Sequence, residues 1–298
     1  MSDLAARPTS RAGRGPAPRG GPGDVEPRPL AGALTTLWGL MRRHARVLRR
    51  ELGPFAARTV MQPLLFVFVF AYVFPRIGQG IGAAGVAGGD ADAAFATVLV
   101  PGLVAVAIIF QGITSVALPL SNEFGGTKEI EDRIMAPVPV QVVALEKVLF
   151  GAAQSVLAGL IVLPMVLAIP AADVELAVTS WPLLVVVTVL AGLLSGALGL
   201  TLGTFVSPRQ IGLMFSLVVL PLTFLGAVYY PWAALDEIAW LQVAVLANPL
   251  VYVSEGLRAA LTPSVETMPV AAFLGALIGS VVVLLWAGLR GFVRRTVG

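Results

Sequence analysis

The sequence predicts an all-α polytopic membrane protein with six transmembrane helices, an N-terminal amphipathic interfacial helix, and a re-entrant helical hairpin before the last span. Hydrophobic residues make up 57% of its 298 residues and charged residues only 12%, and the mean hydropathy is +0.88. Several windows exceed the length of about 18 apolar residues that is typical of a membrane-spanning helix. The charged residues gather in short segments between these windows, so a soluble domain is excluded.

Two segments precede the first expected span. Residues 1–29 are rich in Pro, Gly and Arg, lack the apolar residues of a core, and are expected to form a disordered cytoplasmic tail. Residues 30–54 are expected to form a basic amphipathic helix in the headgroup plane, ended by Gly53-Pro54. Its apolar face steps by three or four residues through Leu34, Trp38, Met41, Ala45, Leu48 and Leu52. Its basic face, which includes Arg42, Arg46 and Arg49, favours anionic lipid headgroups over nucleic acid.

The six spans are expected at about 59–74, 94–120, 148–169, 182–206, 211–230 and 270–289. Pro101 is expected to interrupt the second span. Glycines in the fourth span follow a small-xxx-small pattern that permits close helix contact. The candidate residues for a substrate path are Phe66, Gln111, Thr114 and Thr223. For the polar residues inside the spans, helix-to-helix hydrogen bonding is the alternative role.

A further apolar run at 238–254 is short for a span, and Asn248-Pro249 breaks its helical pattern. With six spans and both termini in the cytoplasm, the inside segments hold every Lys and Arg except Arg76 and Arg258. A seventh crossing would place the C-terminal arginines outside, so residues 232–262 are expected to enter the membrane and return. Asp236, Glu237, Glu255 and Arg258 are expected to mark the watery ends of this hairpin.

The segment between the second and third spans, at 121–147, is the most highly charged part of the chain after the first expected helix. Glu129 and Arg133 stand at the i,i+4 spacing of a helical ion pair. Ile130 and Ile134 form a second face, and Pro137 then ends the helix. Because a helix of about two turns is marginal in water, it is expected to dock on a cytoplasmic partner. A solvated loop that only joins two spans is the alternative.

The chain has no cysteine, and its FGGTK segment lacks the spacing and the Ser/Thr of a phosphate loop. No motif for a metal site, cofactor or nucleotide is expected in this chain. No Asp or Glu lies in the middle of an expected span, although ion-coupled carriers normally need one. The energy for any transport must therefore reach the chain from a partner.

Two stretches carry a family resemblance: NEFGGTKEIEDRIMAPVPVQVVALEKVLFGA and YYPWAALDEIAWLQVAVLANPLVYVSEGLRAAL. Their order and spacing resemble the type 2 ABC exporter permeases, and most of all the daunorubicin/doxorubicin-resistance exporter type. The resemblance covers nearly all of the chain after Leu30. It implies a transport subunit of the cell (plasma or inner) membrane without an ATPase site of its own. It also implies a dimer with a second copy or a paralogue, and two separate ATPase subunits that bind ATP and Mg²⁺.

The resemblance also assigns roles to residues. A coupling helix at about 123–136 would seat in the ATPase through Glu123, Phe124, Lys128, Glu129, Ile130, Arg133 and Ile134. The N-terminal helix would touch the ATPase at the membrane through Trp38, Arg42, Arg46 and Arg49. The hairpin would close the exit path through Tyr230, Pro231, Asn248, Pro249, Glu255 and Arg258.

Three functions are compatible with these features of the sequence. The first is export of a lipophilic molecule, such as an antibiotic or a lipid-like metabolite, because the spans are apolar and uncharged. The second keeps the family and changes the cargo to a polysaccharide or glycolipid, for which the aromatic residues of 66–72 are a hint. The third is a membrane scaffold or intramembrane enzyme without an ATPase, although no nucleophile and base pair is visible in the spans.

Overall fold

A computed structural model describes residues 38–39, 41–42, 46, 49–50, 52–73, 91–125, 139–167, 176–207 and 209–297. Within these ranges the regular elements are all helical. The longer helices are α2 (Leu52–Val67), α4 (Ala91–Gly125), α6 (Val140–Leu167), α7 (Trp181–Phe205), α8 (Ile211–Phe224), α10 (Pro249–Leu261) and α11 (Val270–Val297). The shorter ones are the π-helical η1 (Phe68–Val73), the 3-10 helices η2 (Trp232–Ile238) and η3 (Val245–Ala247), and α9 (Ala239–Ala244).

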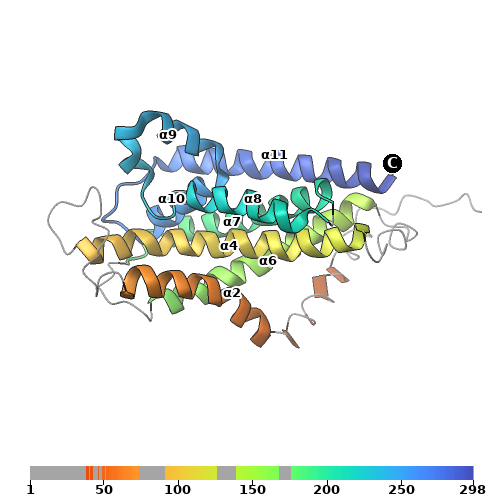
Figure 1. The fold of residues 1–298 in the computed structure, drawn as a ribbon, viewed down its shortest axis with the longest axis horizontal. Helices are drawn as coiled ribbons and strands as arrows, with labels where there is room; N and C mark the ends of the chain where they lie inside the picture. Colours follow the sequence, from red (N-terminus) through yellow and green to blue (C-terminus); the bar gives the residue numbers. More distant parts are fainter. Residues whose placement is uncertain are drawn as a thin grey trace, which may run out of the picture.

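The long helices lie side by side along the longest axis of the molecule (Figure 1). Helix α7 is central, because α4, α6 and α11 all pack against it. Helix α9 and its neighbours lie at one end of this bundle, and the C-terminal ends of α4 and α11 lie at the other (Figure 1). Five of the described cations lie at that second end, in a turn or within about two turns of a helix end: Lys147, Arg209, Arg290, Arg294 and Arg295.

Four of the described helices are long and apolar enough to cross a membrane: Thr97–Gly125, Val140–Met165, Trp181–Phe205 and Val270–Thr296. A fifth candidate is the pair Trp232–Ala247 and Pro249–Leu261, which bends by 105° at its break. Helix α2 has 16 residues and α8 has 14. The chain is thus a multi-pass membrane protein, while the count of six spans stays a prediction.

Several helices differ in extent from the sequence-based expectation. The predicted interruption at Pro101 is wrong, because α4 runs through both Pro101 and Pro119. A proline inside an apolar helix removes one hydrogen bond, and neighbouring helices can compensate for it. Helix α6 begins at Val140, directly after Pro139, so Glu146 and Lys147 lie within it. Helix α8 ends at Phe224, and Ala227 follows with a φ of 52°, in the left-handed region that ends helices.

The glycine stripe of α7 packs inside the chain. A Cβ atom at Gly196 would lie 2.5 Å from the carbonyl oxygen of Val148 on α6. A Cβ atom at Gly199 would lie 2.9 Å from the carbonyl oxygen of Gly112 on α4. These glycines therefore allow the backbones of α6 and α4 to approach α7 closely, as small residues do in membrane bundles.

Candidate functional site

The bent helix pair, Trp232–Ala247 with Pro249–Leu261, turns at Asn248. The side-chain Oδ1 of Asn248 accepts a hydrogen bond from the Leu250 N–H at 3.0 Å and so caps α10, whose first residue is Pro249. Its Nδ2 donates to the Leu222 carbonyl of α8 at 2.8 Å. One side chain thus sets the break in the pair and attaches it to α8.

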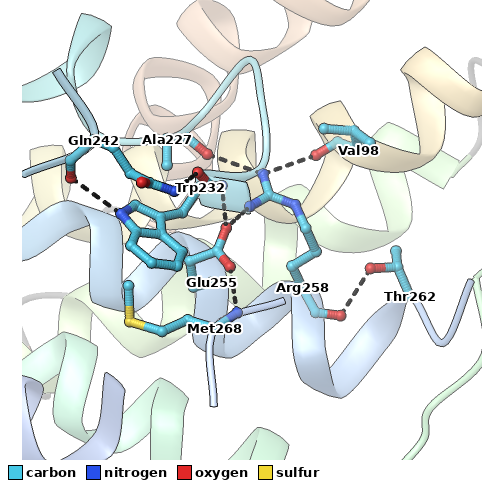
Figure 2. A network of polar contacts seen from close by, with 8 residues as sticks. All are labelled: Val98, Ala227, Trp232, Gln242, Glu255, Arg258, Thr262 and Met268. Carbon is cyan, nitrogen blue, oxygen red and sulfur yellow. Dashed lines mark hydrogen bonds and ion pairs between the residues drawn. The ribbon is translucent and has the colours of Figure 1, made fainter. Parts of the chain in front are cut away.

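A polar network at the centre of α10 holds the bent helix pair in place (Figure 2). Glu255 and Arg258 form an ion pair through Glu255 Oε1 and Arg258 Nη1, and neither residue has any exposed surface. Arg258 Nη2 donates to the carbonyls of Ala227 at 2.9 Å and Val98 at 3.3 Å. Glu255 accepts from the backbone N–H groups of Trp232 at 3.1 Å and Met268 at 2.9 Å.

The expectation that Glu255 and Arg258 mark a watery end of the hairpin is wrong, since both are completely buried. They tolerate burial because each charge faces the other and also meets backbone dipoles, which replace the lost water. Asp236 and Glu237, expected at the other end, are exposed. Of the three guanidinium nitrogens of Arg258, Nη1 and Nη2 are bonded to described groups, whereas the buried Nε has no hydrogen-bond partner among them.

The Glu255–Arg258 network joins segments that are far apart in the sequence. Val98 lies on α4, and Ala227 lies between α8 and η2. Trp232 is the first residue of η2, and Met268 precedes α11. The sequence carried no signal for the backbone groups of Val98, Ala227 and Met268, because any residue supplies a carbonyl or an N–H. The network therefore fixes the position of the bent helix pair relative to two candidate spans.

The remaining hairpin residues also make local contacts. The Tyr230 hydroxyl donates to the Phe224 carbonyl at 3.2 Å, and half-buried Pro231 precedes η2. The indole Nε1 of Trp232 donates to the Gln242 carbonyl at 3.1 Å, which closes the segment between η2 and α9. Trp232 was missed by the sequence reasoning, although it directly follows the Tyr-Pro pair.

The polar residues expected along a substrate path are engaged with other helices or with their own backbone. Gln111 is buried, accepts from the Thr59 hydroxyl of α2 at 3.1 Å, and donates to Gln154 of α6 at 3.4 Å. Among the residues that the structure describes, Thr114 and Thr223 donate to carbonyls of their own helices and to no other group. Phe66 lies in α2, and its side chain is outside the described part of the structure.

At the opposite end of the bundle, Glu123 and Phe124 belong to the last turn of α4. Glu123 pairs with Lys147 of α6 at 2.7 Å, with both side chains mostly buried. Phe124 lies against Phe292 and Arg295 of α11. The other expected coupling residues, Lys128, Glu129, Ile130, Arg133 and Ile134, lie outside the described residues.

The described residues of the first expected helix are helical, and all but Met41 are exposed. Trp38 has 72% of its surface exposed, and Arg42, Arg46 and Arg49 are also exposed. This exposure of a tryptophan beside arginines suits a helix at a membrane surface. Gly53-Pro54, expected to end that helix, lies in the first turn of α2, where proline is tolerated.

Comparison with known proteins places these features in context. Residues 35–262 match the family model described as ABC-2 type transporter. The chain is 28% identical over 250 residues to the inner membrane transport permease YadH of Escherichia coli K12, covering 83% of this chain and 89% of that protein. The same values hold for YadH of Escherichia coli O157:H7 and of Shigella flexneri. The matched range includes α4, the bent helix pair, and both Glu255 and Arg258.

Proposed function

Because the chain belongs to the ABC-2 type transporter family, we propose that it is the permease subunit of an ATP-driven exporter for a lipophilic molecule. A separate ATPase subunit binds ATP and Mg²⁺ and supplies the energy. Two permease chains, identical or paralogous, form the pathway, and both termini of each chain lie in the cytoplasm. The observation that carries this proposal is the family match over residues 35–262.

The arrangement of the bundle supports different roles for its two ends. The segment expected to dock on the ATPase follows Phe124, at the end that carries Lys147, Arg290, Arg294 and Arg295. An excess of Lys and Arg is typical of the cytoplasmic side of a membrane protein. The bent helix pair lies at the other end, where it closes the exit path from outside.

The hydrogen bonds inside the bundle support a lipophilic cargo. Thr59, Gln111 and Gln154 bond to one another, and the buried hydroxyl groups of Ser155 and Ser195 lie 2.8 Å apart. The Thr201 hydroxyl donates to the backbone carbonyl of Leu284 on α11 at 3.0 Å. Since these groups already bond within the protein, what remains along the helices is mainly apolar, and it suits an antibiotic or a lipid-like metabolite better than a glycan.

Transport into inside-out membrane vesicles tests this function. Vesicles from cells that produce the chain with its ATPase receive MgATP and an organic extract of the culture, and mass spectrometry identifies what accumulates. ATP-dependent accumulation of an apolar compound is expected, and vanadate abolishes it. Accumulation of a glycan would overturn the cargo class, and uptake only by right-side-out vesicles would overturn the direction.

A further inference from the structure

The last turn of α4 is held on one side by α11. The ring of Phe124 meets that of Phe292 at a centroid distance of 5.6 Å and an angle of 63°. The guanidinium of Arg295 lies 4.4 Å from the centroid of the same Phe124 ring. Residues three apart on a helix share a face, so Phe292 and Arg295 together hold Phe124 between an aromatic edge and a cation.

The same guanidinium is bonded to the end of α7. Arg295 Nη1 donates to the Thr204 carbonyl at 2.6 Å, with the carbonyls of Val206 and Gly203 at 3.3 and 3.4 Å. The last carbonyls of a helix have no partner within it and carry partial negative charge. Arg295 therefore supplies from α11 the cationic cap that α7, with no basic residue in its last turn, does not supply itself.

Glu123, the residue before Phe124, ties the same turn to α6 through its 2.7 Å ion pair with Lys147. The end of α4 is thus joined to α6, α7 and α11 within two consecutive residues. A displacement of this turn must either carry the neighbouring helix ends with it or break these contacts. Helices α4 and α7 also pack directly one turn earlier, where a Cβ atom at Gly203 would lie 3.0 Å from Leu120 Cδ2. Beyond that point, the described contacts of Arg295 reach both the Phe124 ring of α4 and the last carbonyls of α7.

We propose that Arg295 is a positioning residue that makes the ends of α4, α7 and α11 move as one body when the segment after Phe124 is displaced. This inference rests on the proposed function, because the ATPase is what displaces that segment. The planar guanidinium suits the role, since it stacks on a ring and donates to several acceptors at once, whereas a lysine ammonium does not. Loss of Arg295 leaves the ATPase bound and hydrolysing ATP while the end of α7 no longer follows the last turn of α4.

Spin-label distances test this movement. The chain has no cysteine, so Asn122→Cys on α4 and Arg209→Cys beyond α7 place labels at two exposed positions without background labelling. The distance is measured in the complex with the co-purifying ATPase, without nucleotide and after trapping with MgATP and vanadate. We expect one unchanged distance in the otherwise native chain. We expect a second, shifted distance for Arg295→Ala after trapping only.

Matched variants separate the role of Arg295 from general damage. Arg294→Ala removes the neighbouring exposed cation, which makes no such contact with the described residues, and keeps the native distance. Arg295→Lys keeps the charge and gives an intermediate population of the shifted distance. Phe124→Leu, which removes the stacking partner, behaves as Arg295→Ala, so the test survives if one variant fails to fold.

The outcomes for this inference and for the proposed function are distinct. If the ATPase co-purifies and Arg295→Ala and Phe124→Leu keep one distance in both states, the inference is overturned while the proposed function stands. A trapping-induced shift of equal size in the chain with native Arg295 would overturn it as well. If no ATPase co-purifies with the chain that has native Arg295, the proposed function is wrong, and so is the inference that rests on it.

Discussion

Glu255 and Arg258 stand three residues apart on α10 and form an ion pair with no exposed surface. Removing two charges from water costs several kcal/mol each, and their attraction offsets this only when further hydrogen bonds satisfy the remaining atoms. Here the backbone groups of Val98, Ala227, Trp232 and Met268 supply those bonds. The Glu255–Arg258 ion pair therefore specifies the position of the bent helix pair against α4 and α11, in addition to any net stabilisation that it provides.

Removing one partner of this pair leaves the other charge buried and unpaired. We expect Arg258→Met to destabilise the protein by about 3–5 kcal/mol, and Glu255→Gln by a somewhat smaller amount, because the amide still accepts one hydrogen bond. The measurement is the temperature at which half of the purified protein, heated in detergent, no longer runs as a single monodisperse peak. The double variant should lose less than the sum of the two singles, since the two groups interact.

Glu266→Gln is the matched control for this pair, because Glu266 is exposed in the connection between α10 and α11. It should leave the melting temperature unchanged. Strictly additive losses in the double variant would contradict the view that the two charges stabilise each other.

Asn248 combines a cap with a link to α8, and two substitutions separate these roles. Asn248→Ser keeps a neutral side-chain oxygen that can accept from the Leu250 N–H but loses the amide donor to the Leu222 carbonyl. Asn248→Ala loses both, and we expect it to cost about 1 kcal/mol more, the usual value of a helix cap. Thermal stability in detergent measures the difference. Equal losses in the two variants would show that the cap contributes nothing.

The close approach of α7 to α6 is tested at Gly196. A Cβ atom there would lie 2.5 Å from the Val148 carbonyl oxygen, so the helices must separate in Gly196→Ala. Overpacking of this kind costs about 1–3 kcal/mol. The control is Gly279→Ala on α11, where a Cβ atom meets nothing within 4 Å. A Gly196→Ala protein as stable as the control would refute the described packing.

Gln111 joins α2 and α6 to α4, and Gln111→Leu removes both hydrogen bonds. Hydrogen bonds between membrane helices average about 0.6 kcal/mol, so we expect a loss of about 1 kcal/mol in stability. Thr114→Val, which removes only bonds to the helix's own backbone, serves as the control. A changed set of exported compounds in Gln111→Leu, with unchanged stability, would place Gln111 in the substrate path instead.

Much of the helical architecture follows from local sequence rules. The start of α7 at Trp181-Pro182 and the break at Asn248-Pro249 were both predicted, because proline and a capping side chain act within one turn. The spans predicted at 94–120 and 270–289 end too early, since α4 continues to Gly125 and α11 to Val297. The sequence places charged residues there, but Glu123 and Arg295 lie within the helices because their partners come from neighbouring helices. Arg290 instead lies over the Trp286 ring of its own helix.

The candidate site was harder to predict for the same reason. Glu255 and Arg258 were identified as residues of the hairpin but assigned to water, because a charge in an apolar sequence is first expected at a surface. Their burial depends on backbone groups of α4 and of the turn after α8, which only the folded chain brings together. Arg295 was predicted only as one of a flanking cluster of cations, since its ring partner Phe124 is far away in the sequence.

We propose that a separate ATPase drives this permease through the segment after α4. The most direct test is to capture the tagged chain from detergent-solubilised membranes and to measure vanadate-sensitive ATP hydrolysis in the eluate. We predict that an ATPase co-purifies and is active, that Glu129→Ala with Arg133→Ala removes it from an intact permease, and that Glu266→Gln retains it. An eluate of monodisperse permease without any ATPase would contradict the account and favour a membrane scaffold or an intramembrane enzyme.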